Sequence, residues 1–376
     1  MMKKIISILV AFSLGISCCF IAKADGFEVS AKAAIVVNAE TGGVIFSQNA
    51  DEKLPMASTT KIMTAILLCE NCELKNTVVA TKEMVTVEGS SMGLLEGDVV
   101  SFEALLYGMM LPSGNDAATT AAIAMAGSLE SFALMMNKKA AEIGMDSTNF
   151  VTPSGLDADE HYSTARDMAK LAVYAMQNPI FRKAVSSETK TLQYGNPPYR
   201  RTLKGHNKIL SLYEGGNGIK TGYTSKSGKC LVSSAERNGK RVIAVTLNDS
   251  STLENHSKLL DLGFERLVLK ELTVPERLEL KIIAETELSA ELQKIEEAMY
   301  LTSEEAENLS YKIKFKNMIY APVKKGETLG EMEYFLDGRK IKSIELKAAN
   351  GICPKRKEHS FCEKMLEVIF KMISVS

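Results

Sequence analysis

Residues 55–68 read PMASTTKIMTAILL, a helix start followed by a nearly continuous apolar run. Residues three apart share one face of a helix, so the Ser58 hydroxyl and the Lys61 amine are expected to meet. The apolar run predicts a buried helix, and burial disfavours the ammonium form of a lysine. A neutral amine beside a hydroxyl is a general base beside a nucleophile. The N–H groups at a helix start also suit a developing oxyanion.

The S-x-x-K pattern is short, and the chain holds a second copy at Ser187 and Lys190. That copy lies in a polar stretch with no apolar helix behind it, so we interpret it as chance. The functional interpretation of Ser58 therefore depends on motifs elsewhere in the chain.

The N-terminus has the pattern of a secretory signal peptide. A basic start (residues 1–4) precedes an apolar run (5–21) and an Ala-x-Ala end (22–24). We predict cleavage after Ala24. The alternatives are a retained anchor and a lipoprotein signal, although the two cysteines of the run lack the usual small residues before them.

Composition excludes several classes of protein. The net charge of −1 over 376 residues offers no basic field, so no nucleic-acid partner is expected. The rest of the chain is long enough for two domains, and it has no second apolar run of bilayer length.

Of the 7 cysteines, 2 would leave with the signal peptide. The C-x-x-C pair Cys69 and Cys72 has no partner cluster, so we expect free thiols or one local bridge, and no metal or other cofactor.

Strand signals flank a helical middle. Glycine turns between apolar runs predict two β-hairpins, the second at Asn238-Gly239. The expected strands are residues 33–38, 44–47, 229–235 and 241–247, and a small-residue helix is expected at 115–126. This order predicts one α/β domain whose sheet is built from both ends of the segment.

Two further motifs follow the first. Ser113-Gly114-Asn115 is weak alone, because S-x-N also occurs at Ser47 and Ser147, and an ordinary helix cap would explain Ser113. Lys220-Thr221-Gly222 occurs once, in an expected strand where Gly222 permits close approach; the alternative is an edge-strand lysine beside a turn. The order S-x-x-K, S-x-N and K-T-G is typical of penicillin-binding proteins and serine β-lactamases.

The chain resembles the low-molecular-weight penicillin-binding proteins, the serine D-Ala-D-Ala carboxypeptidases of peptidase family S11. The resemblance covers roughly residues 33–264 and includes segments 90–98, 153–167 and 205–208 around the motifs. It implies an α/β catalytic domain similar to penicillin-binding proteins and serine β-lactamases, with an antiparallel sheet and helices. A small C-terminal β-rich domain also fits the family.

The resemblance implies a catalytic role for three residues. Ser58 would be the acylated nucleophile and Lys61 its general base. Ser113 would pass a proton toward the amine of the leaving D-alanine.

It also implies a set of substrate-binding residues. Asn115 would hold the substrate's peptide carbonyl, and Lys220 would keep the site positive and Lys61 neutral. Thr221 would bind the terminal carboxylate. Gly222 and Tyr223 complete the binding strand, with the backbone N–H groups of Tyr223 and Ser58 forming the oxyanion hole.

The chain departs from the family at one position. Many members carry an arginine for carboxylate binding after the strand that ends near residue 247, whereas residues 248–256 hold none. The segment is more similar to a subgroup with a histidine there, which includes sporulation-associated members. His256 is therefore either a functional residue or a helix-start histidine, and His161 and His206 are expected to be structural.

Composition shifts after residue 270. Residues 273–283 and 311–320 alternate like strands, and residues 332–336 and 341–346 flank Asp337-Gly338, a hairpin signal. The expected domains are 1–24, 25–271, 272–350 and 351–376. The last comprises a basic linker and an amphipathic helix over 361–373, expected to lie on the outer face of the cytoplasmic membrane. The alternative is a helix packed on its own domain.

The expected function is therefore an exported, extracytoplasmic D-Ala-D-Ala carboxypeptidase, peripherally attached to the membrane. It would remove the terminal D-alanine from peptidoglycan pentapeptides through Ser58, and β-lactam antibiotics would acylate the same serine. From this activity we expect a role in the maturation of the cell wall or of the spore cortex. The alternatives are a D,D-endopeptidase or transpeptidase, a β-lactamase, and a non-enzymatic peptidoglycan-binding protein. The chain has no E-x-x-L-N segment of the kind that class A β-lactamases carry between the second and third motifs, which disfavours a β-lactamase. The intact motifs disfavour a non-enzymatic protein with an inactive site.

Overall fold

The computed structural model describes residues 27–280, 288–315 and 322–351, together with Met365. The expected signal peptide and, apart from Met365, the expected C-terminal helix lie outside these residues. No single helix in the described ranges is long and apolar enough to cross a bilayer, and helices Asn115–Ala126 and Leu129–Ile143 reach that length and composition only as a pair bent by 87°.

The catalytic part is built on a five-stranded antiparallel sheet whose strand order is β2-β1-β9-β8-β7. Its strands are β1 (Ala31–Asn38), β2 (Val44–Gln48), β7 (Gly216–Thr224), β8 (Gly228–Arg237) and β9 (Lys240–Asp249). Both expected hairpins are confirmed, and Asn238 and Gly239 turn the second with positive φ values of 51° and 79°. The sheet is therefore assembled from both ends of the segment, as the strand signals predicted.

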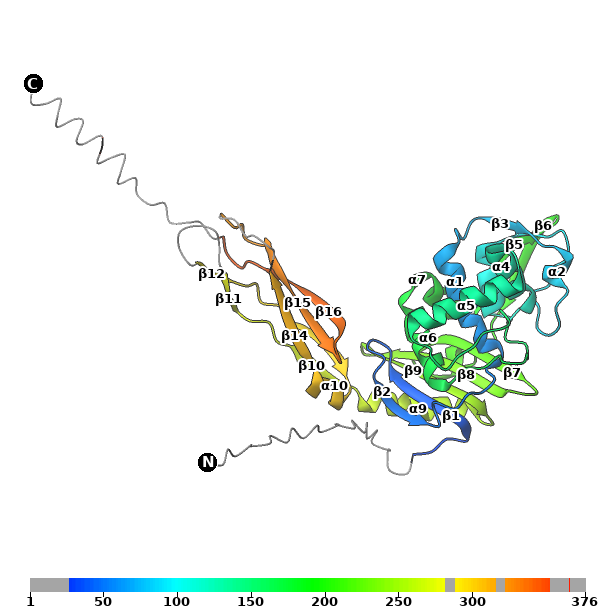
Figure 1. Cartoon of the computed structure of the whole chain (residues 1–376), viewed down its shortest axis with the longest axis horizontal. Helices are drawn as coiled ribbons and strands as arrows, with labels where there is room; N and C mark the ends of the chain where they lie inside the picture. The colour runs from blue at the N-terminus through cyan, green and yellow to red at the C-terminus, as the bar shows by residue number, and fades with distance from the viewer. Residues whose placement is uncertain (1–26, 281–287, 316–321, 352–364, 366–376) are drawn as a thin grey trace, which may run out of the picture.

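Helices cover both faces of this sheet (Figure 1). Beneath it lies α9 (Thr252–Arg266), which buries Leu259 and Leu260 against Val36 and Ala244. The opposite face carries the 3-10 turn η1 (Ala57–Thr60) and helices α1 (Lys61–Asn71), α3 (Phe102–Met110), α4 (Asn115–Ala126), α5 (Leu129–Ile143), α6 (Ala165–Gln177) and α7 (Pro179–Val185). The expected helix at 115–126 is confirmed as α4, and the apolar run after Ser58 is the buried helix α1.

Short elements surround this core. They are α2 (Lys82–Val85), α8 (Ile209–Leu212), the strand pair β3 (Thr77–Val79) and β4 (Val99–Ser101), and the strand pair β5 (Thr189–Gly195) and β6 (Pro198–Lys204). The second S-x-x-K copy lies at the start of β5, where Lys190 pairs with Glu103 at 2.9 Å rather than with Ser187. This arrangement agrees with the interpretation of that copy as chance.

The C-terminal part is β-rich, as expected, and has its own core around Leu301, Leu329, Met332 and Leu346. Its elements are β10 (Val268–Leu272), β11 (Arg277–Leu280), β12 (Leu288–Glu291), β13 (Glu297–Leu301), α10 (Ser303–Asn308), β14 (Ser310–Phe315), β15 (Thr328–Leu336) and β16 (Arg339–Lys347). The expected hairpin around Asp337-Gly338 joins β15 to β16.

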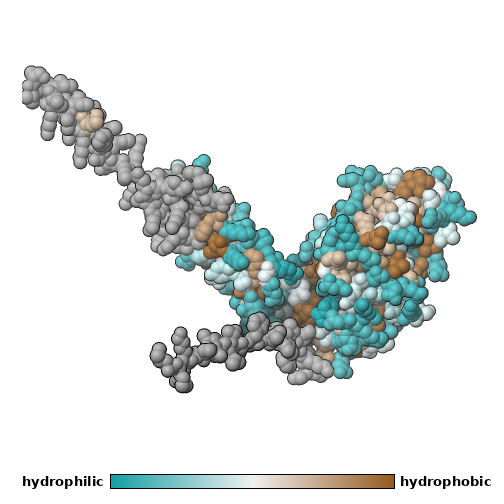
Figure 2. Space-filling view, in the orientation of Figure 1, coloured by the Kyte–Doolittle hydropathy of each residue, from teal (hydrophilic) through white to brown (hydrophobic). Residues whose placement is uncertain are grey.

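The two parts touch at the end of the catalytic sheet that is formed by the turn between β1 and β2. Asn38 donates from Nδ2 to the Tyr300 carbonyl oxygen at 2.9 Å, and Arg339 donates to the Thr41 carbonyl oxygen. The Lys240 ammonium lies 5.5 Å from the Tyr300 ring centroid. Figure 2 shows a mostly hydrophilic surface on both parts, with hydrophobic patches gathered over the helical end of the catalytic part.

His256 lies inside the layer between α9 and the sheet and is 0% exposed. Its Nδ1 is 2.5 Å from Ser233 Oγ, and its Nε2 is 2.9 Å from Thr246 Oγ1. Burial lowers its pKa to about 3. These contacts favour the structural interpretation of His256, because both ring nitrogens are used within the core.

Neutral His256 makes the fold sensitive to acid. The unfolded chain binds a proton at the ordinary histidine pKa of about 6.5, whereas the folded pKa is about 3. The stabilisation is therefore complete above pH 6.5 and is lost as the pH falls toward 3. Between pH 6.5 and 4.5, protonation at this residue alone should lower the free energy of unfolding by about 2 kcal/mol. Urea unfolding of wild type and His256→Gln across that range measures it, and equal pH slopes for both proteins would contradict the assignment.

Candidate active site

The nucleophile candidate lies in a tight turn that leads into α1. Ser58 belongs to the 3-10 turn η1, and Lys61 is the first residue of α1. Ala57 just before it has a φ of 47°, a left-handed conformation that is uncommon for residues other than glycine. The Lys61 Nζ lies 2.9 Å from Ser58 Oγ, so the structure brings together the pair expected from the spacing.

Lys61 is 0% exposed and has two further contacts, both with oxygen acceptors. Its Nζ lies 2.7 Å from Asn115 Oδ1 and 2.7 Å from the Ser154 carbonyl oxygen. Burial lowers its pKa well below the ordinary value, the charge of Lys220 lowers it further, and Asp116 raises it. A neutral amine has two N–H groups, which these two oxygens use. Its lone pair is then left for the Ser58 hydroxyl proton.

The Ser154 carbonyl was not singled out by sequence reasoning, because it is a backbone group held by long-range contacts. Thr64 Oγ1 donates to the Pro153 carbonyl at 2.6 Å and docks the loop on α1. His161 Nδ1 accepts from the Val151 N–H at 2.9 Å, which leaves the other ring nitrogen to contact Thr60 Oγ1 at 3.0 Å. Burial lowers the pKa of His161 to about 4, consistent with a neutral, loop-holding histidine.

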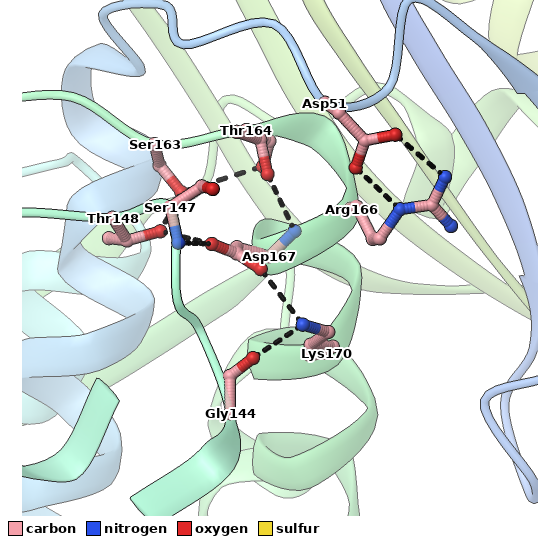
Figure 3. A network of polar contacts seen from close by, with 9 residues as sticks. All are labelled: Asp51, Gly144, Ser147, Thr148, Ser163, Thr164, Arg166, Asp167 and Lys170. Carbon is pink, nitrogen blue, oxygen red and sulfur yellow. Dashed lines mark hydrogen bonds and ion pairs between the residues drawn. The ribbon is translucent and has the colours of Figure 1, made fainter. Parts of the chain in front are cut away.

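Figure 3 shows the network that fixes both ends of this loop. The Asp167 carboxylate, at the start of α6, accepts from the Ser147 N–H and from Thr148 Oγ1, both at 2.9 Å. The backbone N–H of Asp167 donates to Thr164 Oγ1 at 3.0 Å, and the Lys170 ammonium lies 3.1 Å from the Asp167 carboxylate. The loop that delivers the Ser154 oxygen is therefore clamped before and after its exposed tip.

Ser113 and Asn115 stand at the start of α4. Ser113 is mostly buried and has a φ of 64°, a second left-handed residue in the site. Asn115 uses Oδ1 for Lys61 and donates from Nδ2 to the Glu88 carbonyl at 2.7 Å. The side chain therefore joins the lysine to segment 88–94, and its second Nδ2 proton remains for another acceptor.

Asp116 is a supporting residue that sequence reasoning missed. Its buried carboxylate accepts from Ser91 Oγ at 2.6 Å and from the N–H groups of Met92, Gly93 and Leu94 at 2.9, 3.1 and 3.0 Å. The only signal in the sequence is an acidic residue directly after the S-x-N motif, in the first turn of a helix, where a carboxylate is favoured.

The K-T-G motif lies on β7, the last strand of the sheet. Lys220 is 2% exposed, burial lowers its pKa to about 7, and its Nζ donates to the Thr221 carbonyl at 3.0 Å. A Cβ on Gly222 would lie 3.0 Å from the Ser58 backbone nitrogen, so glycine lets β7 pass directly against the nucleophile turn. Tyr223 follows and is 67% exposed.

Lys220→Met is expected to move the acid limb of the acylation rate to higher pH. The positive charge of Lys220 lowers the pKa of Lys61, so its removal raises that pKa. If neutral Lys61 is the proposed base, the limb should therefore move to higher pH. Stopped-flow acylation between pH 5 and 9 measures the limb, with the exposed Lys226→Met as control. A limb at the wild-type pH would contradict this coupling.

Comparisons with known protein families agree on one similarity. A protein-family model described as D-alanyl-D-alanine carboxypeptidase, of peptidase family S11, matches residues 20–251. A second, described as penicillin-binding protein 5, C-terminal domain, matches residues 280–352.

Curated relatives cover most of the chain. It is 32% identical over 337 residues to the D-alanyl-D-alanine carboxypeptidase DacF of Bacillus subtilis, covering 84% of this chain and 86% of the relative. It is also 32% identical over 343 residues to the D-alanyl-D-alanine carboxypeptidase DacC of Escherichia coli, covering 85% of this chain and 83% of the relative.

Solved structures give the same similarity in three dimensions. The Streptomyces K15 DD-transpeptidase superposes with a TM-score of 0.60 at 33% identity, covering 64% of this chain and 98% of that one. The D-alanyl-D-alanine carboxypeptidase DacD of Francisella tularensis gives a TM-score of 0.60 at 26% identity, covering 88% and 95%. The second match extends over both parts of the chain.

Proposed function

Because the chain belongs to the D-alanyl-D-alanine carboxypeptidase family, peptidase family S11, we propose that Ser58 is the nucleophile with which it cleaves D-Ala-D-Ala. The chain is a serine-type D-Ala-D-Ala carboxypeptidase with a penicillin-binding-protein fold and a β-rich C-terminal domain. The observation that carries the assignment is the 2.9 Å contact between Ser58 Oγ and a fully buried Lys61.

Acylation follows from this contact. Neutral Lys61 takes the hydroxyl proton as Ser58 Oγ attacks the carbonyl carbon of the penultimate D-alanine. The N–H groups of Ser58 and Tyr223 are assigned to the developing oxyanion, because Gly222 holds β7 against the nucleophile turn. Ser113 relays this proton from Lys61 to the leaving amine, so D-alanine departs and Lys61 is neutral again. Lys61 then takes a proton from the water that attacks the acyl-enzyme, and the proton returns to Ser58 Oγ as the acid is released.

Binding roles are assigned to the residues around this pair. Asn115 has one unused Nδ2 proton, which suits the peptide carbonyl of the substrate. Lys220 supplies positive charge next to Lys61, and Thr221 offers a hydroxyl to the terminal carboxylate. Asn115 Oδ1 and the Ser154 carbonyl already hold Lys61 in the free site, so its proposed reactive arrangement does not depend on bound substrate.

The proposed substrate is the pentapeptide stem of peptidoglycan, and β-lactams would acylate Ser58 in its place. We also propose that the enzyme works outside the cytoplasm in wall or spore-cortex maturation. Attachment to the outer face of the membrane rests on the amphipathic pattern at 361–373.

One experiment tests the Ser58 assignment. Wild-type protein is mixed with benzylpenicillin, the intact mass is followed over time, and the adduct is located by peptide mapping. D-alanine release from diacetyl-Lys-D-Ala-D-Ala is measured in parallel. We expect one adduct per chain on Ser58 and steady D-alanine release. An adduct on Ser113 or Ser187, or rapid penicillin turnover without D-alanine release, would overturn the assignment.

A further inference from the structure

A cavity of about 410 Å³ lies beside Thr221, and none of the roles above uses its other walls. It is lined by β7 and β8 through Thr221 and Lys229, by the loop before α8 through His206 and Lys208, and by residues 250–254 at the start of α9. It therefore opens from the strand to which the terminal carboxylate of the substrate has been assigned.

Lys229 is placed on the cavity side of the sheet by strand register. In the pairing of β7 with β8, Tyr223 lies opposite Lys229, and Thr221 lies opposite Leu231. Paired residues and residues two apart share a face, so Lys229 and Thr221 point to the same side of the sheet. The Lys229 ammonium contacts only the Ser250 carbonyl, at 3.4 Å, in the region that the structure describes.

The cavity is electropositive. Across the described ranges no carboxylate pairs with Lys229 or Lys208, while the acidic residue on the wall, Glu254, is paired with Lys258 at 2.7 Å. The first turn of α9 adds the partial positive charge of a helix N-terminus. An anionic ligand entering beside Thr221 would therefore meet an unpaired ammonium.

The substrate of the proposed function ends in such an anion. The scissile carbonyl lies at Ser58, against Gly222, and the leaving D-alanine ends in a carboxylate one residue further on. One residue of extended chain spans about 3.3 Å, so a substrate running antiparallel to β7 would bring its carboxylate from Gly222 to the level of Thr221. Adjacent strands are about 4.8 Å apart, a gap that a lysine side chain crosses.

We propose that Lys229 is the cation that recognises the free carboxylate of the leaving D-alanine, with the Thr221 hydroxyl as its hydrogen-bonding partner. This inference rests on the proposed function, because it uses Ser58 to place the scissile bond. Lys229 is then a specificity residue for substrates that end in a free acid. An ammonium acts there as a point charge without the two-pronged geometry of a guanidinium.

The test compares diacetyl-Lys-D-Ala-D-Ala with the same peptide ending in an amide. In Lys229→Met, kcat/KM for the acid should fall at least tenfold, while kcat/KM for the amide changes less than twofold. Lys229→Arg, which keeps the charge, should retain most of the activity. Lys208→Met removes the other lysine of the cavity and should leave both values within twofold of wild type.

The chemistry provides an internal control. Once D-alanine or its amide has left, both peptides give the same acyl-enzyme, so the deacylation rate in Lys229→Met must equal that of wild type. The proposal is overturned if Lys229→Met loses activity equally on the acid and the amide, deacylates more slowly, or keeps the wild-type ratio of kcat/KM for acid and amide. It is also overturned if Lys208→Met shows the loss in place of Lys229→Met. If the penicillin adduct maps to Ser58 in wild type, such a result rejects the role of Lys229 alone. If it maps elsewhere, the proposed function itself fails.

Discussion

Lys61→Met is expected to slow the acylation of Ser58 by about 10³-fold or more, within the range of general-base catalysis. Methionine is unbranched, apolar and one atom shorter than lysine, so it suits a site that is 0% exposed, but its thioether is too weakly basic to take the Ser58 proton. It also leaves Asn115 Oδ1 and the Ser154 carbonyl without the donor that each now has at 2.7 Å. Each unsatisfied buried acceptor costs about 1–3 kcal/mol, so the variant should also be less stable.

The rate is measured as penicilloyl adduct against time, with Ser58→Ala setting the background. The second S-x-x-K copy provides a matched control. Lys190→Met removes a lysine at the same spacing from a serine, but one that pairs with Glu103, and it should acylate at the wild-type rate. A Lys61→Met rate within tenfold of wild type, in a folded protein, would show that another group takes the proton.

Gly155→Ala is expected to cost about 3 kcal/mol or more of unfolding free energy and to reduce acylation sharply. Gly155 has a φ of 85°, and a Cβ there would lie 1.9 Å from the Ala57 carbonyl oxygen and 2.8 Å from Thr60 Oγ1. The left-handed conformation costs an alanine about 1–2 kcal/mol, and the clash adds to it because the nearest atom is backbone. Relief requires movement of the turn that carries Ser58 or of the loop that carries the Ser154 carbonyl.

Gly97→Ala separates the two causes. Gly97 has the same φ of 85°, but a Cβ there would meet nothing within 4 Å. It should show the conformational cost alone and acylate normally. Urea unfolding gives the free energies and penicillin acylation gives the rates. Equal losses in both variants would mean that the close contact between the loop and the nucleophile turn does not matter.

The sequence could predict what depends on short spacing. Ser58 and Lys61 are one helical turn apart, and Asn238-Gly239 carries the conformation of its own turn, so both features were predicted from local pattern. The apolar run after Ser58 also predicted the burial of Lys61, which lowers its pKa. The roles of the three motifs came from a family resemblance and stay predictions. The structure places the motifs at η1 and the start of α1, at the entry to α4, and on β7.

What the sequence could not predict depends on contacts between distant segments. The Ser154 carbonyl reaches Lys61 only because its loop is docked by Thr64 and clamped by Asp167. Asp116 looks like an ordinary first-turn acid until segment 91–94 folds over it. His256 was open to two interpretations, since only the packing of α9 on the sheet shows which face of the helix it occupies.

The position of β7 at the end of the sheet order has a consequence for how a ligand is held. An edge strand can be extended by an incoming peptide, which then forms backbone hydrogen bonds as an added strand. Affinity gained in this way does not depend on side chains, so most of the recognition is left to the two ends of the peptide. Exposed edge strands are also the usual starting points of aggregation. On β7 this edge includes Gly222, which packs against the backbone of Ser58. A peptide bound in this way would cover the edge of β7.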